Sequence, residues 1–380
     1  MQSTTPFSGA VRLGILGGGQ LGKMIIDEVM RYDIFVGTLD PSTQASTAPY
    51  AHICRHGDFR KREDVLEFGA DFDVLTIEIE DVNTDALREL EAQGKRVYPQ
   101  PDVIDIFRDK SVQKEFYRKH AIPTSDFVIL ENKPTDWDDF PVVWKAATGG
   151  YDGKGVKLLR GKSDLVDLPD GRCVMEELVP IAKEIGVIVS RNVSGEIAVF
   201  PPVEMEFHPE ANLVELVFAP ANISAEQSAE AERLARILAE KTRIVGTLAV
   251  ELFLDNDGNF IVNESAPRVH NSGHLSIEAC YTSQFEQHVR AILDLPLGDT
   301  SLIMPAAMGN VVGEPEYSGK VVYLGAEELL RQRGVYLHLY GKTETRPYRK
   351  MGHITCLHKS TTQAREIVRS LRQTFKIIAQ

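Results

Sequence analysis

The sequence has few cysteines and no long apolar run. Its four cysteines, Cys54, Cys173, Cys280 and Cys356, lie far apart and form no CxxC pair. This spacing indicates neither a zinc site nor a disulfide framework, and it is typical of reduced thiols in a cytoplasmic protein. No segment approaches the ~18 apolar residues of a membrane span, and the polar start, MQSTTPFSGA, does not resemble a signal peptide. We therefore expect a cytoplasmic protein with no membrane partner.

Positive charge is also in short supply. The chain has 42 lysines and arginines against 55 aspartates and glutamates, which gives a net charge of -13. A protein of this sign is not expected to bind nucleic acid or anionic membranes in general. A local basic cluster stands out against this background: Lys342, Arg346, Arg349 and Lys350. It is either a solvated hairpin or, as we predict, a site for a phosphate or bicarbonate.

A third absence is the Walker A motif, GxxxxGK[ST], so any nucleotide site must be of another kind. The segment TGGYDGKG is nevertheless rich in glycine and ends near Gly155. Glycines let backbone N–H groups approach a phosphate closely, and Lys145 and Lys154 would add positive charge. A flexible surface turn is the alternative interpretation. We predict a mobile phosphate-binding lid at Gly150–Gly155.

The order of apolar runs predicts a mixed α/β and α+β protein. Up to residue 107, apolar runs alternate with helical patterns, which is typical of a parallel α/β sheet. Asp73–Glu80 is expected to be one of its strands. Around residues 120–178 we expect a small α+β lobe in which Cys173–Val179 forms an edge strand. Further helices are predicted at Ser224–Thr242, at 273–295 and from Thr361, and the predicted domains are 1–107, 108–298 and 299–380.

The most informative segment is the predicted hairpin at residues 247–265. If Asp257-Gly258 form a two-residue type I′ turn, Glu251 faces Glu264 across the strands. Their Cβ atoms would then lie roughly 5 Å apart. The strands are otherwise apolar, and burying two like charges is costly unless a cation lies between them. We therefore predict a magnesium site completed by substrate phosphates, against the alternative of a solvated pair. Asn263 should point to the opposite face.

A competing interpretation comes from GGGQLG at Gly17–Gly22, which satisfies the GxGxxG pattern. Asp40 follows about twenty residues later, as the ribose partner of a nicotinamide cofactor would. An NAD-dependent oxidoreductase is therefore the rival prediction. It leaves the paired glutamates of the hairpin and the lysines around TGGYDGKG without a function.

Taken together, these motifs resemble those of a known family. GGGQLGKM, GGYDGKG, VNESAPRVHNSGH and GKTETRPYRKMGH are similar to segments of the N5-carboxyaminoimidazole ribonucleotide synthetases, the ATP-grasp carboxylases of purine biosynthesis. The resemblance covers nearly the whole chain. It implies an ATP-grasp fold with an N-terminal Rossmann-like domain and a small β-rich C-terminal domain. It also implies a homodimeric, ATP-dependent carbon–nitrogen ligase that joins bicarbonate to 5-aminoimidazole ribonucleotide through carboxyphosphate.

The resemblance also assigns site residues. Bicarbonate or carboxyphosphate would be surrounded by Arg268, His270, Asn271 and Lys350. The ribonucleotide would face Gln20, Glu80, Tyr151, Asp152 and Arg349. Mg²⁺, or Mn²⁺, would be held by Glu251 and Glu264. ATP would contact Arg108, Lys145, Gly150, Tyr151, Asp152, Gly153, Lys154, Gly155, Val156, Glu176, Glu177, Leu178, Val179, Glu184, His208, Asn263 and Glu264.

Some positions depart from the family pattern. Lys23 stands where an arginine is usual, Ile79 where an aromatic is usual, Val269 replaces the proline of APRPH, and Tyr348 stands where glycine is common. None of these changes removes a charged or metal-binding group. Two further alternatives remain: another ATP-grasp ligase, similar to formate-dependent glycinamide ribonucleotide transformylase, and a nucleotide-binding regulator without catalytic activity.

Overall fold

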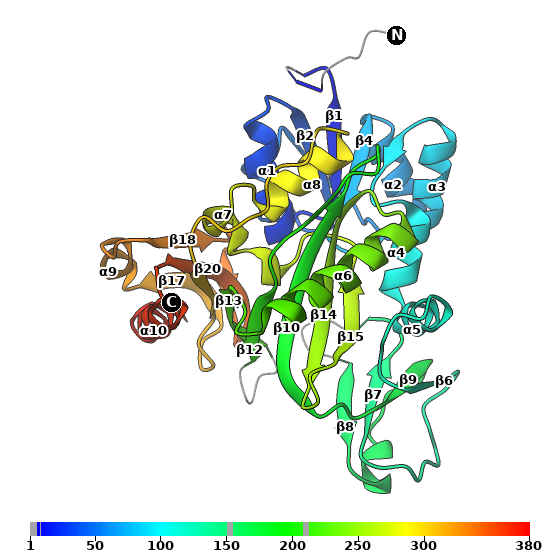
Figure 1. The fold of residues 1–380 in the computed structure, drawn as a ribbon. Helices are drawn as coiled ribbons and strands as arrows, with labels where there is room; N and C mark the ends of the chain where they lie inside the picture. Colours follow the sequence, from blue (N-terminus) through cyan, green and yellow to red (C-terminus); the bar gives the residue numbers. More distant parts are fainter. Residues whose placement is uncertain (1–5, 8, 150–154, 208–212) are drawn as a thin grey trace.

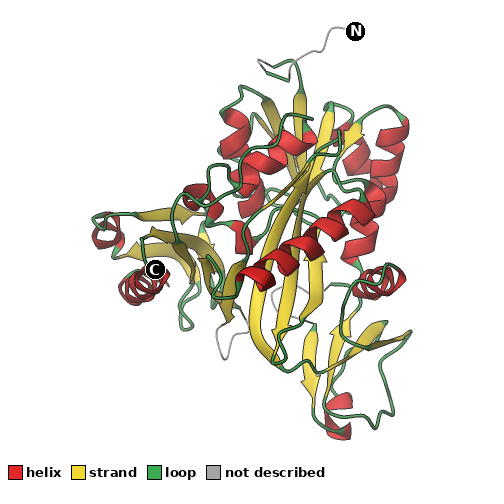
Figure 2. Ribbon diagram, in the orientation of Figure 1, coloured by secondary structure: helices red, strands yellow, loops and turns green. Residues whose placement is uncertain are grey.

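The computed structural model describes residues 6–7, 9–149, 155–207 and 213–380. Figure 1 shows a parallel N-terminal sheet, a small lobe at the opposite end, and long strands that run between them. Figure 2 shows that helices flank the N-terminal sheet and lie across the long strands. Within the described part of the chain, no helix is long and apolar enough to cross a membrane.

The N-terminal sheet has the strand order β3-β2-β1-β4-β5, and all its strand pairs are parallel. Its strands are β1 (Arg12–Leu16), β2 (Phe35–Asp40), β3 (Ile53–His56), β4 (Val74–Ile77) and β5 (Arg96–Val97). Its helices are α1 (Gln20–Met30), α2 (Arg62–Gly69), α3 (Thr84–Ala92) and α4 (Pro101–Arg108). The predicted strand at Asp73–Glu80 is too long, because β4 ends at Ile77 and the next residues bend toward the glycine turn.

A small four-stranded antiparallel sheet forms the lobe, in the order β6-β9-β7-β8. Its elements follow helix α5 (Lys110–Lys119) and are β6 (Phe127–Leu130), β7 (Val142–Ala146), β8 (Val156–Leu159), the short helix η1 (Lys162–Leu165) and β9 (Cys173–Glu177). The prediction that Cys173–Val179 forms an edge strand is wrong, because β9 is paired on both sides, with β6 and with β7. This pairing explains why Cys173, Val174 and Met175 are buried.

The largest sheet joins the middle of the chain to its C-terminal part, in the order β15-β14-β10-β12-β13-β16-β20-β18, with β11 on β10. Its strands are β10 (Ile181–Arg191), β11 (Ile197–Val199), β12 (Val203–Phe207), β13 (Val214–Ala219), β14 (Gly246–Asp255), β15 (Phe260–Ala266), β16 (Ala306–Val312), β18 (Val335–Leu339) and β20 (Lys350–Leu357). Because β13 pairs with β16, this sheet runs across the predicted boundary at 298/299, and the domain limits stay a prediction.

Helix α6 (Ala225–Thr242) lies on the long strands and buries Leu234, Ala235 and Leu238 against them. Ser224 begins it with a capping box that includes Gln227. The single helix predicted at 273–295 is instead η2 (Asn271–Gly273), α7 (Ser276–Ala279) and α8 (Gln284–Ile292). The chain breaks there because Cys280 forms a β-bridge with Leu302 and Ser283 caps a new helix.

The C-terminal part adds a three-stranded sheet, β19-β17-β21, and two helices. These elements are β17 (Gly319–Leu324), α9 (Ala326–Leu330), β19 (Glu344–Thr345), α10 (Thr361–Thr374) and β21 (Lys376–Ala379). Helix α10 packs its apolar side, including Val368, on β16 and β20. The predicted closing helix from Thr361 is thereby confirmed.

Candidate active site

Two glutamates face each other on the hairpin formed by β14 and β15. Glu251 and Glu264 are register partners, as the sequence predicted. The predicted turn, however, is wrong. The Asp255 N–H donates to the Asn259 carbonyl at 3.0 Å, so the loop has three residues and not two. It ends at Gly258, whose φ of 87° suits a three-residue hairpin loop.

A β-bulge restores the pairing of Glu251 with Glu264, which the three-residue loop alone would have shifted by one residue. Between Glu251 and Leu252 the register slips by one residue, which leaves Asn263 without a partner in the ladder. The prediction that Asn263 points to the opposite face is therefore wrong. Its Oδ1 accepts a hydrogen bond from Lys145 at 2.8 Å, and Lys145 also lowers the pKa of Glu264. Asn263 and Glu264 therefore serve the same side of the hairpin.

Three lysines lie near the hairpin, where they pair with Glu264 and with a third carboxylate, Glu176. Lys110 forms an ion pair with Glu264. Lys114 and Lys145 both contact the buried Glu176, at 2.9 and 3.0 Å. Lys110 and Lys114 were missed by sequence analysis, because they lie in a polar stretch that reads as a surface helix. Their spacing of four residues, which places both on one face of α5, is the signal that could have found them.

The carboxylates differ sharply in their pKa. Burial, together with the charges of Glu264 and Glu184, raises the pKa of Glu251 to about 8. The charge of Lys110, against the effect of burial, lowers the pKa of Glu264 to about 2. Burial also raises the pKa of Glu184 to about 7. The protein therefore supplies less positive charge at Glu251 than at Glu264, so that without a cation the negative charge of the pair resides mainly on Glu264.

A second group of side chains lies near Glu251 and the end of β4. His270 Nε2 is 3.7 Å from a Glu251 oxygen, and Lys350 is close enough to oppose the rise in the pKa of Glu251. Arg268 Nε forms an ion pair with Glu80 at 2.9 Å, which ties the hairpin to the N-terminal sheet. One basic region, with Lys110 and Lys145, therefore lies at Glu264, and a second, with His270 and Lys350, lies at Glu251.

Asn271 contacts neither carboxylate among the described hydrogen bonds. It exchanges two amide hydrogen bonds of 2.8 Å with Asn310 of β16. This reciprocal pair fixes the start of η2 against the large sheet, one residue after His270.

The glycine turn before α1 is filled by the protein's own carboxylates. Glu78 accepts hydrogen bonds from the backbone N–H groups of Gly19 and Gly22, and Asp40 accepts from Gly18 at 2.7 Å. A dinucleotide would need these N–H groups for its pyrophosphate. The oxidoreductase interpretation is therefore contradicted by the geometry of this turn.

Comparison with known proteins decides the family. The chain matches a ribonucleotide synthetase preATP-grasp domain at residues 10–108, an ATP-grasp domain at 115–285 and a phosphoribosylaminoimidazole carboxylase C-terminal domain at 306–367. It is 36% identical over 361 residues to N5-carboxyaminoimidazole ribonucleotide synthase of Bacillus subtilis, covering 92% of each chain. The chain belongs to the N5-carboxyaminoimidazole ribonucleotide synthetase family. The predicted ATP-grasp fold and N5-carboxyaminoimidazole ribonucleotide synthetase activity in purine biosynthesis are thereby confirmed.

Solved structures agree with this assignment. The N5-carboxyaminoimidazole ribonucleotide synthetase from Thermotoga maritima is 39% identical, with a TM-score of 0.88, and covers 97% of this chain and 100% of its own. An Aspergillus clavatus synthase in complex with ADP and 5-aminoimidazole ribonucleotide is 31% identical, with a TM-score of 0.86, over 97% and 99% of the two chains. The chain spans 67% of phosphoribosylaminoimidazole carboxylase of Ogataea methanolica and 64% of that of Vigna aconitifolia.

The remaining site residues predicted for a family member are placed as follows. Residues Gly150, Tyr151, Asp152, Gly153, Lys154 and His208 lie outside the described residues. Gln20 begins α1, Val156 begins β8, and Gly155 lies in the turn just before β8. Glu177 and Leu178 are exposed and Val179 is half-buried after β9. Arg108 pairs with Asp105 at 2.9 Å, and Arg349 donates to the Glu344 carbonyl at 2.6 Å.

Tyr348 explains one departure from the family pattern in physical terms. Its φ of 59° lies in the left-handed region, where glycine is favoured because it has no Cβ. The glycine that is common at this position in the N5-carboxyaminoimidazole ribonucleotide synthetases therefore suits the backbone, and the tyrosine adopts the same conformation at a cost in strain.

Proposed function

We propose that this chain carries out its ligase reaction through carboxyphosphate formed between the two basic regions of the site. A bicarbonate oxygen attacks the γ-phosphorus of ATP, and the bond from that phosphorus to the ADP oxygen breaks. The amine of 5-aminoimidazole ribonucleotide then forms a bond to the carboxyl carbon, phosphate leaves with its bonding electrons, and the amine loses a proton. The observation that carries this proposal is the pairing of Glu251 with Glu264, of which Glu264 faces Lys110 and Glu251 faces His270.

The lysine side suits ATP. Lys145 holds Glu176 and Asn263 and would meet the phosphates, while the exposed backbone at Glu177–Val179 is suited to adenine and Glu184 to the ribose. The other proposed contacts are Arg108, Gly150–Val156, His208 and Glu264. The lysine and arginine side chains and the backbone N–H groups of this set would offset phosphate charge in a site that is already partly desolvated.

The carboxylate pair fits a divalent cation. Among the described side chains, no three His, Cys, Asp or Glu residues form a ready-made metal cage, which suits a metal held by two carboxylates and substrate phosphates. The high pKa of Glu251 marks the place where positive charge is needed. Mg²⁺ or Mn²⁺ held by Glu251 and Glu264 would supply charge that offsets the phosphates.

The arginine side suits the small acid and the ribonucleotide. Arg268 offers a planar guanidinium that matches bicarbonate, and His270, Asn271 and Lys350 would complete its surroundings. Gln20, Glu80, Tyr151, Asp152 and Arg349 would face 5-aminoimidazole ribonucleotide. The lid predicted at Gly150–Gly155, which would exclude water because carboxyphosphate is prone to hydrolysis, lies outside the described residues except for Gly155 and stays a prediction.

An isotope experiment tests the carboxyphosphate route. Bicarbonate labelled with ¹⁸O should pass one labelled oxygen to the released phosphate, because that oxygen is the nucleophile at the γ-phosphorus. The measurement is mass spectrometry of phosphate from a reaction with ATP and 5-aminoimidazole ribonucleotide, with labelled water as the control. Unlabelled phosphate from labelled bicarbonate, at full product yield, would contradict the route.

The compartment and the oligomeric state of the protein are also proposed. We propose a cytoplasmic homodimer. All four cysteines are free, and Cys173, Cys280 and Cys356 are buried, which suits a reducing compartment. Burial raises the pKa of the Cys280 thiol to about 12 and that of Cys356 to about 11, so neither is a reactive thiolate.

A further inference from the structure

Gln284, at the first position of α8, is a fully buried polar side chain that no step of the proposed reaction uses. Both polar atoms of its side-chain amide form hydrogen bonds with the main chain of His270. The His270 N–H donates to Gln284 Oε1 at 2.9 Å, and Gln284 Nε2 donates to the His270 carbonyl at 2.6 Å. The same Nε2 lies 3.2 Å from His274 Nδ1. One side chain therefore holds both ends of the His270–His274 turn.

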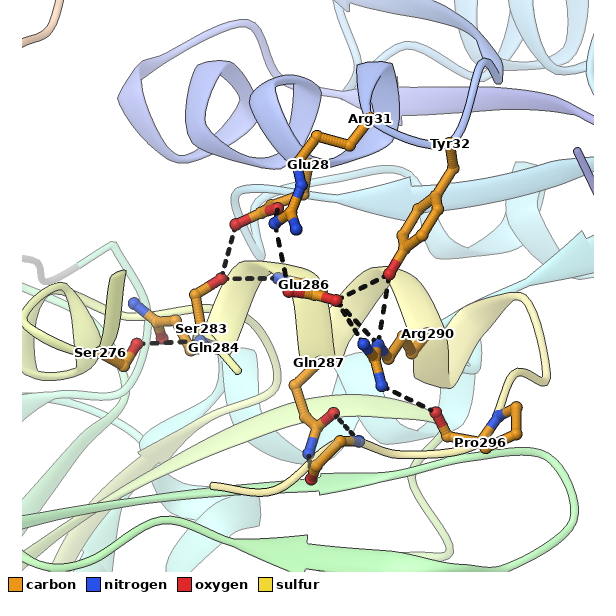
Figure 3. A network of polar contacts seen from close by, with 11 residues as sticks. Glu28, Arg31, Tyr32, Ser276, Ser283, Gln284, Glu286, Gln287, Arg290 and Pro296 are labelled. Atoms are coloured by element: carbon orange, nitrogen blue, oxygen red, sulfur yellow. Dashed lines mark hydrogen bonds and ion pairs between the residues drawn. The ribbon is translucent and has the colours of Figure 1, made fainter. Parts of the chain in front are cut away.

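The surrounding residues keep this amide in place. Ser276 Oγ accepts a hydrogen bond from the Gln284 backbone N–H at 2.9 Å and donates to the Gly273 carbonyl at 2.6 Å. The neighbouring Ser283 donates to Glu28 of α1 at 2.8 Å. Figure 3 shows Ser276, Gln284 and the Ser283–Glu28 contact at the start of α8. The start of α8, which carries Gln284, is therefore bonded both to α7 and to the N-terminal part of the chain. We call the Gln284 amide, with its two bonds to the His270 main chain, the amide clamp.

Gly273 makes room for the clamp. A Cβ atom at this position would lie 2.5 Å from Gln284 Oε1 and 2.6 Å from its Cδ, which is closer than non-bonded atoms approach. A side chain at residue 273 is therefore incompatible with the observed position of the amide. The turn needs its glycine here for space, since no positive φ is involved.

The clamp fixes where the His270 imidazole points. His270 Nδ1 lies 3.0 Å from Ser272 Oγ, which leaves Nε2 toward Glu251 at 3.7 Å. With the peptide held by Gln284 and the ring held by Ser272, the imidazole keeps one orientation. Pre-organisation of this kind matters because a displacement of about 1 Å can cost about a hundredfold in rate.

We propose that Gln284 is a positioning residue that holds His270 for the carboxyl-transfer step. The inference rests on the proposed function, because it gives His270 a place beside carboxyphosphate. Gln284 itself touches no reacting atom. When the His270 peptide loses its clamp, ATP should still be bound and cleaved, but the activated carboxyl should be lost to water more often than it is transferred.

The same helix offers a matched control. Gln287 is equally buried, and its amide forms the same two bonds with a different main-chain segment, at Gly298: Gly298 N to Oε1 and Nε2 to the Gly298 carbonyl, both 2.8 Å. Figure 3 shows both glutamines on α8. Replacing either by methionine removes its two hydrogen bonds to the main chain while keeping the length of the side chain, and Gln284→Met also removes the contact with His274 Nδ1. The two variants should therefore lose similar stability, whereas only one should lose catalysis.

The test compares Gln284→Met with Gln287→Met for product formation, phosphate release and thermal midpoint. For Gln284→Met we expect product formation to fall about 30- to 100-fold and the ratio of phosphate to product to rise, while the KM for ATP changes less than about twofold. Gln287→Met should keep the wild-type ratio. Equal effects of the two variants, or a wild-type ratio in Gln284→Met, would overturn the inference.

A second variant reaches the clamp from the other side. Gly273→Ala keeps Gln284 but displaces its amide, so it should raise the ratio of phosphate to product in the same way. If Gln284→Met does not fold, Gly273→Ala serves as the test. A wild-type ratio of phosphate to product in Gly273→Ala would also overturn the inference. Wild-type protein that releases no phosphate in response to bicarbonate and ribonucleotide would refute the proposed function instead, so the two failures are distinguishable.

Discussion

Replacing Glu264 by glutamine is expected to lower turnover by about a thousandfold, which corresponds to ~4 kcal/mol of transition-state stabilisation. Glutamine keeps the shape of the side chain but removes the negative charge that pairs with Glu251 to hold the cation. It also leaves Lys110 without its carboxylate partner. The measurement is the steady-state rate of phosphate release at saturating ATP and bicarbonate.

The control for this variant is Asp257→Asn, which makes the same change of charge at the exposed tip of the same hairpin. It should keep the wild-type rate. If the two glutamates were only a solvated pair of like charges, Glu264→Gln would relieve their repulsion and leave turnover unchanged. That result would remove the carboxylate pair from the mechanism.

Arg268→Lys is expected to lower kcat/KM for bicarbonate by about a hundredfold while changing the KM for ATP less than about threefold. Lysine keeps the charge, and with it an ion pair to Glu80, but it loses the planar fork of the guanidinium. The reason for the selective effect is position, because Arg268 pairs with Glu80 whereas Lys145 contacts Glu176 and Asn263. The measurement is initial rate at varied bicarbonate and then at varied ATP.

Arg236→Lys, on the exposed side of α6, is the matched control and should leave both parameters unchanged. Two other results for Arg268→Lys would contradict this expectation. If Arg268 only ties the hairpin to the N-terminal sheet, the lysine variant should retain its kinetics toward bicarbonate. An equal loss toward ATP and bicarbonate would show a general disturbance of the site.

The hairpin shows how far sequence reasoning reaches. The pairing of Glu251 with Glu264 was predicted correctly, but from a two-residue turn that the protein does not form. A three-residue loop shifts the register by one, and the bulge at Asn263 shifts it back. An alternating sequence pattern does not reveal the loop length or the bulge separately. Each of them alone shifts the pairing by one residue and so moves every side chain to the other face, but together they cancel. Asn263 was consequently assigned to the wrong face.

Other features depend on contacts between distant parts of the chain. Lys110 and Lys114 read as surface residues because their partners, Glu264 and Glu176, are far away in sequence. The sequence does not indicate that Glu78 accepts the hydrogen bonds of the GGGQLG turn, since Glu78 is far from Gly19 in the sequence. Gln284 was invisible for the same reason. Periodicity indicated the N-terminal sheet and the helix at Ser224–Thr242 well, because those patterns are local.

The most direct test of the whole account is phosphate release from ATP with bicarbonate and 5-aminoimidazole ribonucleotide varied independently. Full release is expected to require both co-substrates, with one phosphate released for each carboxylated product. Release that is indifferent to bicarbonate, or that proceeds equally with formate in its place, would contradict the assignment of the arginine side of the site to bicarbonate.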